Sequence, residues 1–165
     1  MQKDTPGSLL VSVRKPESIT TASAEQIRPA GPAREIPLSH DKAHIAIAPV
    51  DSDFMNAAVW KITLPPKLDL NLHPILRIRY IGDVARLTLD GKLIADNFYS
   101  GREFDLGLQR YAPEIFTSDL RLEILPLRRN APIFLEPKAR PDFGTNESLV
   151  KLQSAAIVNQ VEFGN

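Results

Sequence analysis

The dipeptide Asp90-Gly91 divides two short stretches, 84–89 and 92–95, in which apolar and polar residues alternate. Asp-Gly at such a position predicts a β-hairpin, because both central residues of a two-residue type I′ turn need a positive φ angle. In the first stretch, Arg86 and Thr88 would lie on the face opposite the odd-numbered apolar positions. This alternation indicates an antiparallel sheet with one buried and one solvated face.

Fourteen prolines and eight glycines cut the 165 residues into short pieces, which favours strands over long helices. Residues 16–37 hold four prolines and are expected to form an extended Pro-rich segment, with one helical turn at 23–27 as an alternative. Another helical turn is expected at 112–117. Short alternating or apolar runs predict further strands at 9–13, 44–48, 59–64, 75–81, 104–108, 120–125, 133–135, 149–152 and 155–163.

Roughly nine to eleven short strands at this spacing are typical of an all-β sandwich or barrel. The fold expected for 1–165 is therefore a single domain, a two-sheet β-sandwich. Trp60 shares a strand face with Ile62, so its ring is expected in the core between the sheets. The mixed pattern of the last two strands predicts a β-bulge.

The charge balance limits the classes of partner. Lys plus Arg equals Asp plus Glu at 20 each, so the basic excess of a nucleic-acid or anionic-membrane binder is missing. The absence of cysteine excludes disulfides, thiolate nucleophiles and cysteine-bound zinc. The sequence has no run of 18 apolar residues and no apolar stretch at its start, so neither a transmembrane helix nor a signal peptide is expected.

Two motifs carry a family resemblance. In the segment GDVARLTLDGKLIADNFYSGREFDLGL, a strand with the pattern a-x-v-x-v-d/n-G-k at 85–92 is followed by Asp-Asn-aromatic at 96–99. The run 124–135 then matches i-l-p-l-r-x-x-a-P-i-y/f-l. Together they resemble the galactose-binding-like, jelly-roll accessory domains of glycoside hydrolases, in particular the C-terminal region of bacterial β-galactosidases of family 35.

The resemblance implies a jelly-roll fold and a non-catalytic, carbohydrate-associated module. Such a module would bind a galactoside or plant-wall glycan weakly, or brace the catalytic domain of a glycosidase. A typical catalytic (β/α)8 barrel needs about 250 residues, more than this chain has, so the chain by itself is not expected to be an enzyme. The resemblance also implies a periplasmic or secreted location. The alternative is a structural or protein–protein interaction module with no sugar site.

The loop 96–102 is the candidate for carbohydrate binding. Sugar sites combine an aromatic face, which stacks on the ring, with planar amide, carboxylate or guanidinium groups that bond its hydroxyls. In the competing interpretation, Phe98 closes the edge of the sandwich while the polar residues before it only satisfy the turn. The candidate binding residues are Asp96, Asn97, Tyr99 and Arg102, with Asp83 and Arg86 as further contacts.

The carboxylates near the motifs lie mostly at turns, where Asp bonds to its own backbone, so no catalytic residue is expected. Asp51, Asp53 and Asn56 place oxygen ligands close together, as a calcium loop would. The glycine and the terminal bidentate glutamate of an EF-hand are missing. A structural calcium at these three residues is thus the weakest of the site predictions, and no other cofactor is expected.

Overall fold

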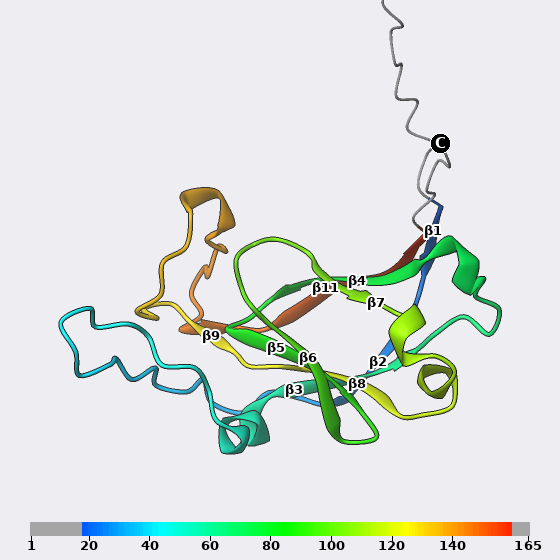
Figure 1. Ribbon diagram of the computed structural model, residues 1–165. Coiled ribbons are helices and arrows are strands. Elements are labelled where there is room, and N and C mark those ends of the chain that lie inside the picture. Colours follow the sequence, from blue (N-terminus) through cyan, green and yellow to red (C-terminus); the bar gives the residue numbers. More distant parts are fainter. Residues whose placement is uncertain (1–17, 160–165) are drawn as a thin grey trace, which may run out of the picture.

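The computed structural model describes residues 18–159, which form two antiparallel sheets packed face to face (Figure 1). The four-stranded sheet has the order β1 (Ile19–Thr21), β11 (Lys151–Asn159), β4 (Pro74–Ile81), β7 (Phe104–Gly107). The five-stranded sheet has the order β2 (Ser23–Arg28), β3 (Ala58–Thr63), β8 (Leu120–Ile124), β5 (Val84–Leu89), β6 (Lys92–Phe98). A small third sheet pairs β9 (Leu127–Arg128) with β10 (Ser148–Leu149).

The strand order is that of a jelly roll, because the chain repeatedly crosses between the two sheets. Strands β3, β4 and β5 alternate between the sheets, and so do β6, β7 and β8. The predicted two-sheet jelly-roll sandwich is therefore confirmed. Short 3-10 helices fill the connections: η1 (Asp51–Asn56), η2 (Leu70–Leu72), η3 (Gln109–Tyr111), η4 (Glu114–Phe116) and η5 (Pro137–Ala139). None of the helices in residues 18–159 is long and apolar enough to cross a membrane.

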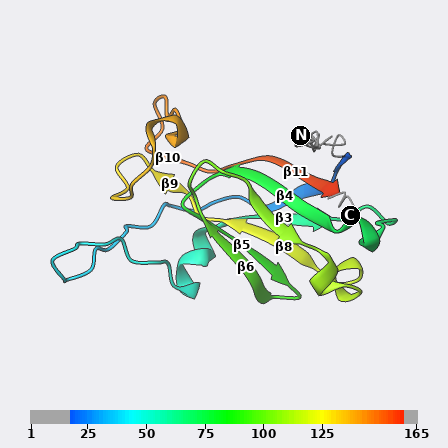
Figure 2. The ribbon, with the colours of Figure 1, turned by 45° about the horizontal axis from the view of Figure 1, so that its top comes forward.

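The predicted hairpin joins β5 to β6 at one side of the five-stranded sheet (Figure 2). Asp90 has φ 49° and Gly91 has φ 79°, as the turn requires. Asp90 also ties the hairpin tip to the start of β8. Its Oδ1 accepts a hydrogen bond from the Asp119 backbone N–H at 2.7 Å, and its own N–H donates to the Asp119 carbonyl at 3.0 Å.

The core lies between the two main sheets and follows the predicted alternation. Leu76, Ile78 and Tyr80 of β4 face Leu87 of β5 and its neighbours across the sandwich, and all are buried. Trp60 is only 8% exposed, so its predicted place in the core is confirmed. Burial of these side chains, at about 25 cal/mol per Å² of apolar surface, is the main term that stabilises the fold.

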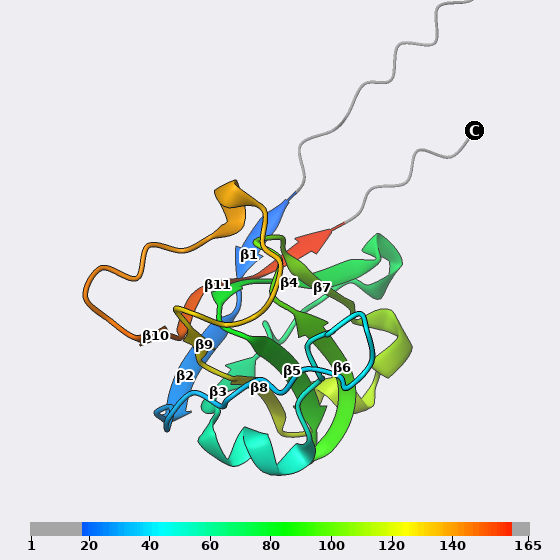
Figure 3. The same cartoon turned by 90° about the vertical axis from the view of Figure 1, so that its left-hand side faces the viewer.

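One edge of the sandwich is formed by a strand that switches sheets. β1 pairs with β11 as far as Thr21, Ala22 donates to the Ala155 carbonyl at 3.0 Å, and β2 then pairs with β3. Figure 3 shows β1 and β2 following one another along this edge. The helical turn predicted at 23–27 is therefore wrong. This stretch carries polar side chains and is exposed along its whole length, so it lacks the apolar alternation of an inner strand.

Two further predicted strands are wrong because no neighbouring strand pairs with them. In 44–48 only Ala46 makes an isolated bridge, to Leu38, within a long loop that extends away from the sheets (Figure 1). The run 133–135 is irregular, and Phe134 is 88% exposed. The backbone of 44–48 bonds to residues 37–39 of its own loop, through Ser39 to Ile45 and Ile47 to Pro37 at 2.8 Å each, and it joins neither sheet.

The remaining predicted strands overlap strands of the structure, although 149–152 falls partly in β10 and partly in β11, and residues 160–163 of the last predicted strand lie outside the described residues. The helical turn expected in 112–117 is present as η4. The predicted bulge lies in β11, where the pairing with β4 shifts between Leu152 and Ser154. The strand predicted at 9–13 lies outside the described residues.

Candidate functional site

The loop after β6 carries the chain from the five-stranded to the four-stranded sheet, and Tyr99 fixes its start. The Tyr99 N–H donates to the Asp83 carbonyl at 3.0 Å, and its hydroxyl donates to the Ala139 carbonyl at 3.0 Å. Its ring meets that of Tyr80 edge to face, with centroids 5.7 Å apart. These contacts hold the half-buried ring in one orientation.

The same loop packs closely against η5. Gly101 has φ 77°, and a Cβ atom at this position would lie 2.6 Å from Cβ of Ala139. Only glycine allows this close approach with this backbone conformation. The loop is therefore held from one side by β4 and from the other by η5.

A polar pocket of about 260 Å³ lies beside this loop. One of its residues, Gln153, is the residue left unpaired by the bulge of β11. A bulge redirects a side chain that a regular strand would point elsewhere. The lining consists of Arg79, Tyr80, Tyr99, Gly101, Arg102, Glu103 and Gln153.

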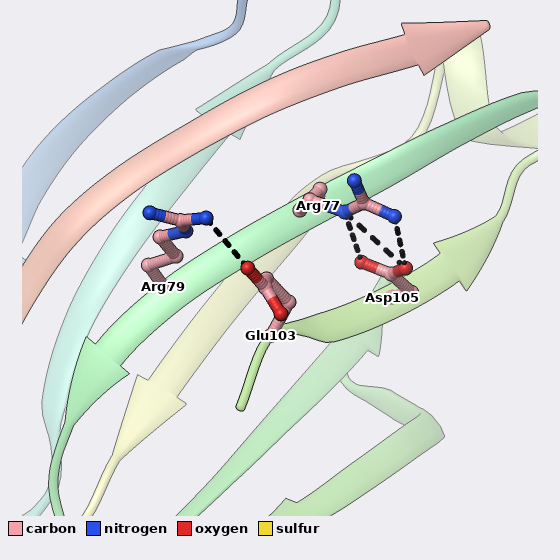
Figure 4. A network of polar contacts seen from close by, with 4 residues as sticks. All are labelled: Arg77, Arg79, Glu103 and Asp105. Carbon is pink, nitrogen blue, oxygen red and sulfur yellow. Dashed lines mark hydrogen bonds and ion pairs between the residues drawn. The ribbon is translucent and has the colours of Figure 1, made fainter. Parts of the chain in front are cut away.

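Two ion pairs stand side by side on the outer face of β4, next to the pocket (Figure 4). The Arg79 Nη2 atom lies 2.6 Å from Oε1 of Glu103, and Arg77 grips Asp105 with two nitrogens at 2.9 and 2.8 Å. The pKa of Glu103 is lowered, first by a hydrogen bond from its own backbone N–H and then by Arg79. Glu103 therefore stays ionised and can accept hydrogen bonds at neutral pH.

Arg102 differs from these arginines. It is exposed, and within residues 18–159 it makes no hydrogen bond or ion pair. The pocket thus offers a guanidinium donor in Arg102, a carboxylate acceptor in Glu103 and an amide that does both in Gln153. This set can bond several hydroxyl groups of one ligand.

Of the six predicted binding residues, the structure places Tyr99 and Arg102 in this pocket. Asp96 and Asn97 lie earlier, on β6. The backbone and side-chain oxygens of Asn97 both accept from the Tyr80 hydroxyl, at 2.8 and 2.9 Å. Burial raises the pKa of Tyr80. Its hydroxyl therefore stays protonated and anchors β6 to β4.

Asp83 lies at the turn between β4 and β5 and makes a buried ion pair. Arg34 Nε is 2.8 Å from Asp83 Oδ2, and the two side chains are only 8% and 5% exposed. Burial raises the pKa of Asp83, while the hydrogen bond and charge of Arg34 oppose that rise. This carboxylate is therefore occupied in fixing the Pro-rich segment to the sandwich.

The Arg86 guanidinium likewise binds other residues of the same chain. Its guanidinium pairs with Glu123 on the neighbouring strand β8 and with Asp51 at 3.0 Å. It also lies 3.8 Å from the centroid of the Phe54 ring, a cation–π contact. Arg86 thus joins η1 to the outer face of the five-stranded sheet.

The predicted calcium ligands lie in η1, where the carboxylates of Asp51 and Asp53 make other contacts. Asp51 pairs with Arg86, and Oδ2 of Asp53 accepts from the Val50 N–H at 2.8 Å. Within residues 18–159, no three His, Cys, Asp or Glu side chains are grouped to hold a metal. A calcium ion at Asp51, Asp53 and Asn56 therefore stays a prediction.

Sequence reasoning missed the half of the pocket that comes from the four-stranded sheet. Arg79 and Gln153 lie on β4 and β11, far from the loop in sequence but joined to it by strand pairing. The outward position of Arg79 and the bulge were both legible in the pattern. Their position next to residues 99–103 could not be predicted, because it depends on the order of the strands.

No protein-family model matches the chain, and comparisons with curated proteins and with solved structures return no significant match. What stands is a β-rich, two-sheet fold with a polar pocket at the β6–β7 loop.

Proposed function

We propose that this chain is a non-catalytic carbohydrate-binding module, with the ligand seated in the polar pocket beside the β6–β7 loop. The observation that carries the proposal is the convergence of Tyr99, Arg102, Glu103 and Gln153 on one small pocket. A sugar presents many hydroxyl groups, each both donor and acceptor, and this set supplies both kinds of partner. The half-buried Tyr99 ring forms one wall of this pocket.

The pocket chemistry supports binding rather than catalysis. Glycoside hydrolysis requires two carboxyl groups roughly 5–9.5 Å apart across the scissile bond. Glu103 is the one carboxylate among the residues that line the pocket, and it is paired with Arg79. The expected ligands are galactosides or plant-wall glycans, and the similarity to glycoside hydrolase accessory domains suggests that a catalytic domain is the natural neighbour.

Calorimetric titration of the whole chain with galactosides and plant-wall oligosaccharides tests the proposal. We expect dissociation constants between roughly 1 μM and 1 mM, equivalent to about 8 to 4 kcal/mol. Arg102→Gln should weaken binding at least tenfold, while Arg110→Gln, which changes an exposed arginine outside the pocket, should not. Equal affinities for the wild type and Arg102→Gln, or silence across the whole panel, would contradict the proposal.

A second candidate function is a structural or protein–protein interaction module. It is favoured by the exposed apolar side chains on and beside the projecting loop, where Ile45, Val50 and Met55 are each more than half exposed. It is also favoured by the internal contacts of Tyr99 and Asn97, which fix them to their own fold. This candidate predicts no sugar binding and tight association with a neighbouring domain.

A further inference from the structure

A second, larger cavity of about 780 Å³ adjoins the polar pocket. It arises where the edge strand switches sheets. β1 pairs with β11 only as far as Thr21 and Ala156, so within the described residues no strand pairs with β11 on that side at 151–154. The bulge falls in this same stretch of β11. The departing edge strand and the bulge together leave a hollow.

One side of this hollow follows the register of the four-stranded sheet, and Ala24 and Trp60 of the five-stranded sheet line its other side. Thr21 pairs with Ala156, which pairs with Arg77, and Ser154 pairs with Arg79. Residues paired across antiparallel strands point to the same side, so these five line one face. All five line the cavity, in which three small side chains leave room between the two guanidinium groups.

The two cavities share a border. Arg79 and Gln153 line both the polar pocket and the larger hollow. From this shared border we infer that the two form one elongated trough, and that the ligand is an oligosaccharide lying along the open edge of the sandwich beside β11, with one end in the polar pocket. This inference rests on the proposed function and names its ligand class.

The size of the trough supports an oligomeric ligand. Sites for drug-sized ligands have volumes of roughly 300–1,000 Å³, and the polar pocket alone falls below that range. The adjoining hollow falls within it. Arg79, whose side chain is 61% exposed, supplies a donor for a hydroxyl group next to the polar pocket and is kept in position by Glu103.

Calorimetric titration with galactose, galactobiose and galactotetraose measures the dependence on chain length. We expect the tetrasaccharide to bind at least tenfold more tightly than the monosaccharide. Ser154→Leu fills the hollow with an aliphatic side chain that cannot donate a hydrogen bond. It should remove the tighter binding of the tetrasaccharide. Ser52→Leu makes the same change at an exposed position in neither cavity and should leave it intact. Circular dichroism establishes that each variant is folded.

Each outcome separates the trough from the pocket. Galactose and galactotetraose binding with equal affinity, or an undiminished gain in Ser154→Leu, would overturn the trough and leave the pocket standing. Unchanged affinities for both sugars in Arg102→Gln, together with a gain that is lost in Ser154→Leu, would support the hollow and overturn the pocket. Absence of binding to every sugar would overturn both.

Discussion

Removal of the Arg34 guanidinium should destabilise the protein in a strongly pH-dependent way. Arg34→Met keeps most of the apolar stem and leaves the Asp83 carboxylate buried without its cation. Breaking a buried ion pair in this way typically costs about 3–5 kcal/mol. The cost has a ceiling, because Asp83 can take up a proton instead of remaining charged.

That ceiling follows from the reference pKa of aspartate. Protonating a carboxyl whose unfolded pKa is about 3.9 costs about 4 kcal/mol at pH 7 and about 1.5 kcal/mol at pH 5, at 1.36 kcal/mol per unit. For a chain of this size, about 4 kcal/mol lowers the midpoint of thermal unfolding by roughly 8–16 °C. The variant should therefore be up to about 4 kcal/mol less stable than the wild type at pH 7, but no more than about 1.5 kcal/mol less stable at pH 5.

The sign follows from proton linkage. Arg34 opposes the rise in the pKa of Asp83, so in its absence the folded-state pKa lies further above the unfolded value. The folded variant then holds its proton more tightly than the unfolded chain does. Its stability is highest below the unfolded pKa and falls as pH rises through the folded pKa.

Urea unfolding of the wild type and variants at pH 5 and pH 7 provides the assay. Arg34→Met combined with Asp83→Asn replaces the charge by an amide and should be both more stable than the single variant at pH 7 and less sensitive to pH. Arg128→Met is the matched control, because the Arg128–Glu35 pair is exposed and worth about 0.2–1 kcal/mol. A loss in Arg34→Met no larger than in this control, or one equal at both pH values, would refute the reasoning.

Three further changes test the loop, the hairpin and the strand anchor. Gly101→Ala should cost about 1–3 kcal/mol, because its Cβ would collide with Ala139 at a positive φ. Thermal unfolding measures this, and an unchanged midpoint would contradict the close packing. Asp90→Asn keeps a side-chain oxygen that accepts from the Asp119 N–H. It removes the carboxylate, whose pKa that hydrogen bond lowers. The stability of the wild type relative to this variant should fall as pH drops below about 4, and urea unfolding at pH 3 and pH 6 would show a constant difference if the linkage were absent. Tyr80→Phe leaves its acceptors on β6 without a donor and should cost about 1–3 kcal/mol, a loss that chemical denaturation should detect.

Local sequence signals predicted the fold wherever they coincided with a partner strand. The Asp90-Gly91 turn is encoded by two residues that tolerate positive φ, so it was legible without any tertiary information. The stretch 44–48 alternates as well as β5 does, but it projects into solvent and makes one isolated bridge. The edge strand β2 was missed for the opposite reason, because a strand that is exposed on both faces shows no alternation of apolar and polar residues.

The candidate site was half predictable for a related reason. Tyr99 and Arg102 belong to one short loop and were found from its composition. Arg79 and Gln153 reach the pocket through the pairing of β4 with β11, two strands about 70 residues apart in the chain, which only the strand order brings together. Asp83 and Arg86 looked available in the sequence, but their carboxylate and guanidinium are occupied by partners that come from distant segments.

The antiparallel pairing of β1 with β11 determines how the domain would respond to a pulling force. Ile19 lies opposite Val158, and Asn159 bonds to Ser18 through both backbone and side chain. Tension applied at residues 18 and 159 would load these cross-strand bonds one after another, as in opening a zipper, instead of shearing them all together. A domain joined to its neighbours at these two points would be mechanically soft, and it would open first along the strand that borders the trough.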